Sequence, residues 1–126
     1  MAATPTLTQD ISSADRSIFV VTWVLTTANP TGIAFEFPEW ADRSFQVGAA
    51  GDAFGTATCT IEGSQDGVTF SPMSNAAGAT AATFTTAGLK QIIELPRYMR
   101  PNLTAVGVAA SITCIMLARR ANPNRT

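Results

Sequence analysis

The sequence predicts an all-β protein: a single-domain, jelly-roll-like β-sandwich with an extended N-terminal arm. Strand-like segments, roughly eight or nine of them, are separated by turn residues at intervals of about ten residues, and no amphipathic helical pattern interrupts them. At 126 residues the chain has the length of one domain with one core. We expect a flexible arm at residues 1–16, the sandwich at 17–120 and a polar tail at 121–126.

In the N-terminal half, the arm is polar and rich in threonine and serine, so it has no core of its own. The first strand is expected at 17–26, where "SIFVVTWVLT" alternates and is rich in β-branched residues. After the turn "ANPTG", a second strand is expected in "GIAFEF" at 32–37. "PEWADR" breaks that strand and places Trp40 near a loop, and "SFQVG" at 44–48 is a further short strand before a glycine-rich loop.

The C-terminal half continues with strands expected in "TATCTIEG" at 56–63 and in "VTFSPM" at 68–73. Between them the Asp-Gly pair at 66–67 is a strong hairpin signal, because glycine takes the positive φ that such turns require. Further strand character lies in "TFTTAG", "LKQIIEL" and "PRYMRPNLTAVG", which together span 83–107. The last strand, "ASITCIMLARR" at 110–120, is apolar on both faces, so it is central to a sheet or covered by a partner.

Composition argues against catalysis and against electrostatic recruitment. The chain has no histidine, which removes the commonest general base and metal ligand and every Ser-His or Cys-His arrangement. The net charge is −1, so no global field draws the protein to nucleic acid or to an anionic membrane. Only 13% of the residues are charged, and seven of the eight basic residues are arginine, which indicates that partners cover part of the surface. We expect no enzyme, no catalytic residue and no cofactor.

Three carboxylates in or beside glycine-containing loops are the candidates for a metal site: Asp52, Glu62 and Asp66. Calcium requires several oxygen ligands that converge, and these acids lack the spacing of a calcium-binding loop. A hairpin turn is therefore the favoured interpretation of "EGSQDGVTF" at 62–70, and we expect no metal. The loop "GAAGDAFG" lacks the strand-to-helix context and the lysine of a phosphate-binding loop.

Cys59 and Cys114 both lie in apolar alternating segments. Two buried thiols are favoured over a disulfide because nothing in the sequence indicates secretion, but whether the two residues pair is left open. The N-terminus lacks the basic and apolar regions of a signal peptide, and no apolar run reaches the ~18 residues of a membrane helix. We expect a cytoplasmic product.

Basic and aromatic side chains gather in the C-terminal half of the chain: Arg97, Tyr98, Arg100, Arg119 and Arg120. Such interleaving occurs in single-strand nucleic-acid binders, but with a negative net charge the favoured interpretation is arginines that reach carboxylates on a neighbouring strand or a partner subunit. Three aromatic residues are candidates for a sugar-binding face, with a place in the core as the favoured alternative: Trp40, Phe45 and Tyr98. The residues that we expect at a protein interface are Trp40, Arg97, Tyr98 and Arg100.

Three stretches together resemble the small virion proteins of tailed bacteriophages: "CTIEGSQDGVTFSPM" at 59–73, "TFTTAGLKQIIELPRYMRPNLTA" at 83–105 and "ASITCIMLARR" at 110–120. They contain, in order, a strand ending in E-G-S, a D-G turn, an aromatic residue, a T-T-x-G step, the pattern "LP-x-Y-x-R-x-N" and an apolar last strand. The resemblance covers residues 59–120, about half of the chain, and does not extend to residues 1–58.

This resemblance implies a capsid decoration, or cement, protein on the outer surface of a phage head. Such proteins bridge subunits of the major capsid protein and are often homodimers or homotrimers, so the implied partners are the major capsid protein and the chain itself, with neither nucleic acid nor membrane. The implied location is the virion, after synthesis in the host cytoplasm. The alternatives are a tail or head–tail connector protein and a carbohydrate-binding β-sandwich, since "EGSQDG" and "LPRYMRPN" also resemble discoidin-type sandwiches.

Overall fold

A computed structural model of the protein describes residues 2–3, 6–9, 18–36, 40–78, 80–94, 96–105 and 110–120. Within these ranges, side chains are described from Val20 onward, except for those of residues 40–42 and 120. The polar tail predicted at 121–126 lies outside the described residues.

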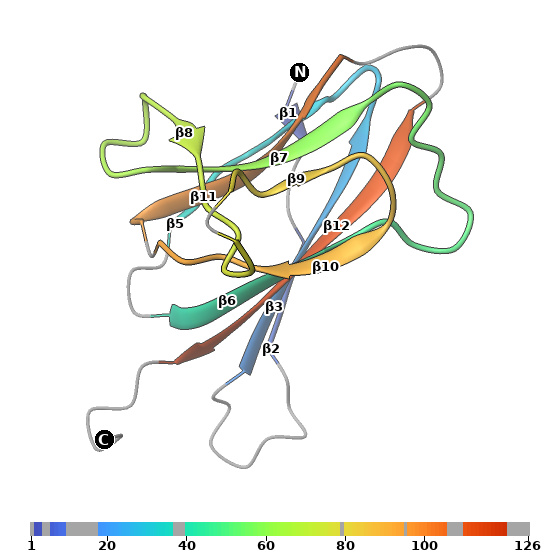
Figure 1. Cartoon of the computed structure of the whole chain (residues 1–126). Coiled ribbons are helices and arrows are strands. Elements are labelled where there is room, and N and C mark those ends of the chain that lie inside the picture. The colour runs from blue at the N-terminus through green and yellow to red at the C-terminus, as the bar shows by residue number, and fades with distance from the viewer. Residues whose placement is uncertain are drawn as a thin grey trace.

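The described residues form two β-sheets and no helix, which confirms the prediction of an all-β sandwich (Figure 1). The first sheet, called here the β7–β11 sheet, has the order β1-β4-β11-β7-β8, with β5 also paired to β11 and β9 to β7. Its strands are β1 (Ala2–Ala3), β4 (Thr31–Gly32), β5 (Phe35–Glu36), β7 (Thr58–Ser64), β8 (Ser71–Pro72), β9 (Thr83–Phe84) and β11 (Tyr98–Thr104).

The second sheet, called the β3–β12 sheet, has the order β10-β6-β12-β3-β2. Its strands are β2 (Thr6–Gln9), β3 (Ile18–Thr26), β6 (Trp40–Val47), β10 (Gly88–Gln91) and β12 (Ser111–Arg120).

One hydrophobic core fills the space between the sheets, and alternation of buried and outward side chains along β3, β11 and β12 contributes much of it. On β3 the side chains of Val21, Trp23 and Leu25 are fully buried, while the residues between them face outward. The Trp23 ring packs on Phe45 of β6 with 6.4 Å between ring centroids, so Phe45 belongs to the core and not to a sugar-binding face. β12 lies between β3 and β6, which is the first of the two predicted alternatives, a strand central to its sheet.

The strands pair in a nested order. β3 pairs with β12, the β4 and β5 segments pair with β11, β6 pairs with β10, and β7 pairs with β8 and β9. Each pair joins strands that are closer in sequence than those of the pair before, as in one long hairpin folded over on itself. All of these pairings are antiparallel; among the described strands, the short β1–β4 pairing is parallel.

The predicted arm at residues 1–16 is described only in part. Residues 6–9 form β2 at the edge of the β3–β12 sheet, where Leu7 lies opposite Val21. Residues 2–3 form β1 beside β4 in the other sheet. These parts of the segment therefore pair with the chain's own sheets, and the rest of the predicted arm lies outside the described residues.

Three predicted boundaries are wrong. Trp40, predicted near a loop, is the first residue of β6, and β6 is longer than the strand predicted at 44–48. The strand predicted at 68–73 is reduced to Ser71–Pro72 of β8, and Val68 is 83% exposed. The strand predicted at 32–37 is described as two short pieces, β4 and β5, because residues 33–34 form no ladder.

Two further buried features distinguish the core. Cys59 and Cys114 are both free and buried, as favoured from the sequence, and burial together with the neighbouring Cys59 thiol raises the pKa of Cys114 well above its usual value. Arg43 of β6 is also fully buried, and its guanidinium donates a hydrogen bond of 2.8 Å to the carbonyl oxygen of Pro96. Burial lowers the pKa of Arg43 to about 10 because the charged form is poorly solvated there.

Candidate functional site

The loop between β7 and β8 is organised by the side chain of Asp66. Its Oδ1 atom accepts hydrogen bonds of 2.8 Å from the backbone N–H groups of Val68 and Thr69 and from the hydroxyl of Ser64. These hydrogen bonds lower the pKa of Asp66 to about 2, and the one from the Thr69 backbone N–H has the largest effect. Gly67 has a φ of 76°, which supports the predicted glycine turn. Asp66 thus closes a hairpin loop through its Oδ1 atom.

The arginines predicted at an interface lie on or beside β11 and are paired with carboxylates of neighbouring strands. Arg100 Nε donates to Glu62 of β7 at 2.9 Å, and its guanidinium lies 3.8 Å from the centroid of the Phe70 ring. Arg97 forms an ion pair with Glu36 of β5 and lies over the Tyr98 ring, 5.4 Å from its centroid. The favoured interpretation, arginines that reach carboxylates on a neighbouring strand, is therefore what the fold contains.

These pairs continue as a hydrogen-bond network across the outer face of the β7–β11 sheet. Glu62 Oε2 also accepts from Asn102 Nδ2 at 3.4 Å, and Asn102 Oδ1 accepts from the Thr31 hydroxyl at 2.8 Å. The Arg100 and Glu62 side chains are only 26% and 15% exposed, although they lie on the outside of the sandwich. The polar side chains of this network therefore satisfy one another's hydrogen bonds within the chain.

The four residues predicted at an interface are not all brought together. Arg97, Tyr98 and Arg100 are neighbours on the β7–β11 sheet, whereas Trp40 begins β6 in the other sheet, opposite Arg120. Only the backbone of Trp40 is described by the structure. Tyr98 is half-buried on the β7–β11 sheet and Phe45 is in the core, so these two residues form no common aromatic face.

The third candidate carboxylate, Asp52, has a structural role of its own. Its Oδ2 atom accepts from the backbone N–H groups of Ala49 at 2.7 Å and of Thr113 at 2.6 Å, which ties the loop after β6 to β12. Asp52, Glu62 and Asp66 are thus engaged by three separate sets of donors. Within the described ranges, no group of three or more acidic or cysteine side chains is placed to hold a metal ion.

The outer face of the β3–β12 sheet has a different character, because its described side chains carry no charge over four strands apart from Arg119 near the end of β12. Residues that face each other across the strands form rows, one running from Leu89 through Gln46 and Ile115 to Thr22, and the next from Gln91 through Ser44 and Leu117 to Val20. Val24 and Thr113 extend the surface beyond the first row. We call this surface the uncharged face; its members are Val20, Thr22, Val24, Ser44, Gln46, Leu89, Gln91, Thr113, Ile115 and Leu117.

Two members of the uncharged face are large apolar side chains with high exposure. Leu89 is 70% exposed and Val24 is 53% exposed, while Ile115 and Leu117 between them are half-buried. Arg119, at the end of β12, is exposed and lies just beyond the last row. Depletion of charged side chains, which this face shares, is characteristic of the centre of protein interfaces.

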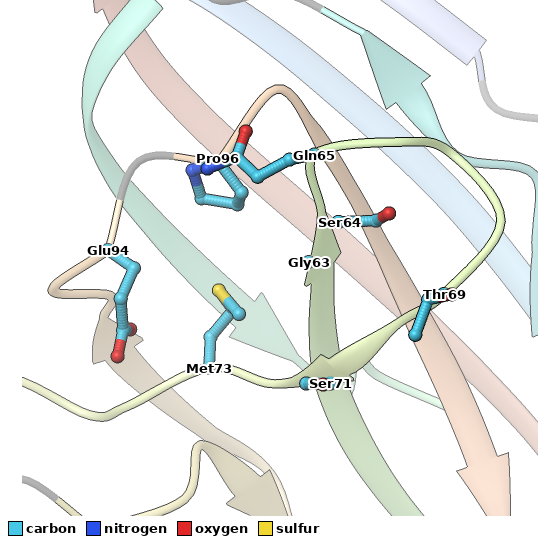
Figure 2. A pocket seen from close by; sticks show the side chains of 8 residues that line it. All are labelled: Gly63, Ser64, Gln65, Thr69, Ser71, Met73, Glu94 and Pro96. Carbon is cyan, nitrogen blue, oxygen red and sulfur yellow. The ribbon is translucent and has the colours of Figure 1, made fainter.

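A pocket of about 330 Å³ opens beneath the hairpin loop (Figure 2). Its floor is formed by buried residues, among them Gly63, Met73 and Pro96, and its rim by exposed polar residues: Gln65, Thr69, Ser71 and Glu94. Figure 2 shows Glu94 on the opposite side of the opening from Thr69. The pocket thus combines an apolar floor with one carboxylate at its rim.

Sequence reasoning did not find this pocket or the buried Arg43. Glu94 and Met73 come from segments about twenty residues apart that carry no motif. The isolated bridge between Asn75 and Ile92 and the hydrogen bond from the Ser74 N–H to Glu94 bring these segments together. For the uncharged face a signal was present, because the last strand is apolar on both faces.

Comparison of the chain with family models, with curated proteins and with solved structures gives no match in any of the three. No helix in the part of the chain that the structure describes is long and apolar enough to cross a membrane.

Proposed function

We propose that this chain is a structural protein of a tailed-phage particle, which binds the outer surface of the capsid and stabilises it by bridging subunits of the major capsid protein. The observation that carries the proposal is the uncharged face. A surface of ten uncharged side chains over four strands, with the charged Arg119 only at its margin, is suited to a protein partner. The phage assignment itself rests on the sequence resemblance of residues 59–120.

The fold supports the same proposal. We assign the sandwich to the jelly-roll type because its strand pairs are nested, with β3–β12 outermost and β7–β8 innermost. Rigid antiparallel sandwiches of this kind occur in viral capsid proteins. A rigid scaffold loses little conformational entropy on binding, so it is suited to a bridging role.

The uncharged face contributes to binding mainly through its apolar side chains. Complete burial of the exposed parts of Leu89 and Val24 contributes about 2–4 kcal/mol, at ~1.5–3 kcal/mol for a fully exposed aliphatic side chain. Stable contacts bury more than about 1,200 Å² in total, and repetition over a symmetric lattice adds avidity. Contacts from other surfaces, including a homodimer or homotrimer interface, supply the rest of that area.

The proposal is tested by rebinding purified protein to heads that lack it. Gln46 is exposed in the middle of the uncharged face, so Gln46→Lys places an unpaired charge there without disturbing the core. Thr104→Lys adds the same charge at an exposed position of β11 in the other sheet and is the matched control.

We expect wild type and Thr104→Lys to saturate the heads and Gln46→Lys to bind at least roughly tenfold more weakly, because a desolvated unpaired charge is costly. Failure of the wild-type protein to bind heads refutes the proposed function. Equal binding by the two variants refutes the role of the uncharged face. Specific binding to a glycan array in place of heads assigns the sandwich to carbohydrate recognition instead.

A further inference from the structure

The pocket beneath the hairpin loop has a size that suits a small ligand, although residues that line it, among them Gln65 and Glu94, also make contacts within the fold. Its volume of about 330 Å³ is at the lower end of the range of ligand sites, enough for one large side chain or a single sugar ring. The floor exists because residue 63 is glycine. A Cβ atom there would lie 2.5 Å from Pro96 Cγ and 2.6 Å from Met73 Sδ, so only glycine lets the proline ring and the thioether close over β7.

The charge at the rim selects the kind of ligand. Glu94 is the one charged residue among those that line the pocket, and its Oε1 atom accepts a hydrogen bond of 2.7 Å from the backbone N–H of Ser74. That hydrogen bond fixes the carboxylate at the edge of the opening and lowers the pKa of Glu94, so it is ionised at neutral pH. An anionic ligand would be repelled there, and a cationic one attracted.

The floor and the rim together exclude a sugar as the best ligand. Sugars are commonly held against an aromatic ring, and no aromatic side chain lines this pocket. Met73 and Pro96 instead offer an apolar surface on which an aliphatic stem can pack while its charged end reaches the rim. Arginine and lysine side chains have that construction.

We propose that the pocket formed by Gly63, Met73, Pro96 and Glu94 binds a cationic side chain, an arginine or a lysine, presented by a protein partner. The stem lies on Met73 and Pro96, the cation pairs with Glu94, and the hydroxyl groups of Thr69 and Ser71 offer further acceptors at the rim. The pocket belongs to the β7–β11 side of the sandwich, so this inference does not rest on capsid binding through the uncharged face.

The proposal is tested by titrating ¹⁵N-labelled protein with Nα-acetyl-arginine amide and recording amide chemical shifts. The neutral isostere Nα-acetyl-citrulline amide, Nα-acetyl-lysine amide and methyl glucoside are titrated in parallel. Glu94→Gln removes the charge but keeps an oxygen for the Ser74 N–H. Asp52→Asn removes one negative charge from the loop between β6 and β7, at the end of the sandwich away from β8, and is the matched control (Figure 1).

We expect saturable shifts of the Gln65, Thr69 and Ser71 amides with a millimolar Kd for the arginine amide, the lysine amide or both, as suits ligands of this size. The comparison of the two cations identifies which head group is preferred. Glu94→Gln weakens binding at least roughly fivefold, and Asp52→Asn leaves it unchanged.

Three results overturn the proposal: no saturable shift at these amides up to about 100 mM of either cation, equal binding of the citrulline amide or the glucoside, or equal weakening by Glu94→Gln and Asp52→Asn. Because the probes are small molecules, each of these results is independent of whether the protein binds heads.

Discussion

Replacing Gly63 by alanine tests how the hairpin loop is seated on the sandwich. Gly63 lies in β7, where the added methyl group would lie 2.5 Å from Pro96 Cγ and 2.6 Å from Met73 Sδ. The end of the methionine side chain can swing away at little cost. The proline ring cannot, because the carbonyl oxygen of Pro96 is held by the buried Arg43 guanidinium at 2.8 Å.

The size of the effect follows from this difference. Overpacking by one methyl group against neighbours that do not yield costs about 1–3 kcal/mol. Gly88, at the start of β10, is the matched control, because a Cβ atom there meets only the Phe84 ring carbons at 3.5 and 3.6 Å, an ordinary contact. Gly88→Ala is therefore expected to be neutral or to stabilise by up to about 1 kcal/mol, since alanine lowers the entropy of the unfolded chain.

Urea unfolding followed by circular dichroism measures both variants. With a slope of roughly 1–3 kcal/mol per molar urea, Gly63→Ala lowers the midpoint by about 1 M, while Gly88→Ala leaves it unchanged or raises it slightly. A Gly63→Ala protein as stable as wild type would show that Pro96 is free to move, and the account of the pocket floor would fail with it.

Three further outcomes are expected. The hydrogen bonds of Asp66 lower its pKa in the folded protein to about 2, from an ordinary value of 3.8, so its contribution to stability is present above about pH 4 and lost as the pH falls through 2. Asp66→Asn should abolish that part of the dependence of stability on acid pH. An unaltered acid profile would contradict the hydrogen-bond arrangement of the loop. The buried thiols of Cys59 and Cys114 should react with maleimide at pH 8 only as fast as the protein unfolds, and rapid labelling of the native protein would show that they are accessible. Deleting residues 2–14, which removes β1 and β2 but leaves the strands of the core, should weaken binding to heads while a β-rich circular dichroism spectrum persists, and unchanged occupancy on heads would refute a role of this segment in binding.

Where strands alternate cleanly, the sequence was sufficient to predict them. β3 and β12 have uninterrupted alternation or apolar runs, and both were found close to their observed bounds. The start of β6 was missed because the inward position 43 is an arginine, which reads as a break in an apolar face. Its burial depends on the carbonyl of Pro96, a contact between residues far apart in sequence.

The strand predicted at 68–73 failed for a different physical reason. Val68 and Phe70 alternate as strand residues do, but the Asp66 carboxylate accepts the backbone N–H groups of Val68 and Thr69. Those donors are then unavailable to a β-ladder, so a local side-chain contact overrides the pattern.

The candidate site shows the same limit. The arginines beside Tyr98 were predicted to reach carboxylates, but the identity of those carboxylates depends on the register that places Arg100 opposite Glu62. The pocket depends on register too, because Gly63 must face Ser71 of β8 for Met73 to fold across it. A single sequence carries no direct record of strand register.

The position of β12 has a consequence for how the chain folds during synthesis. This strand is the last of the sandwich to leave the ribosome, yet it forms the middle of its sheet and pairs with β3 on one side and β6 on the other. Until it emerges, β3 and β6 each have an unpaired edge, and the two halves of that sheet have no direct hydrogen bonds to each other. The sheet therefore closes only after residues 111–120 have been synthesised, through contacts of high sequence separation that form slowly. Nascent chains that stall before residue 111 are expected to present open strand edges, and these are the species on which chaperones act.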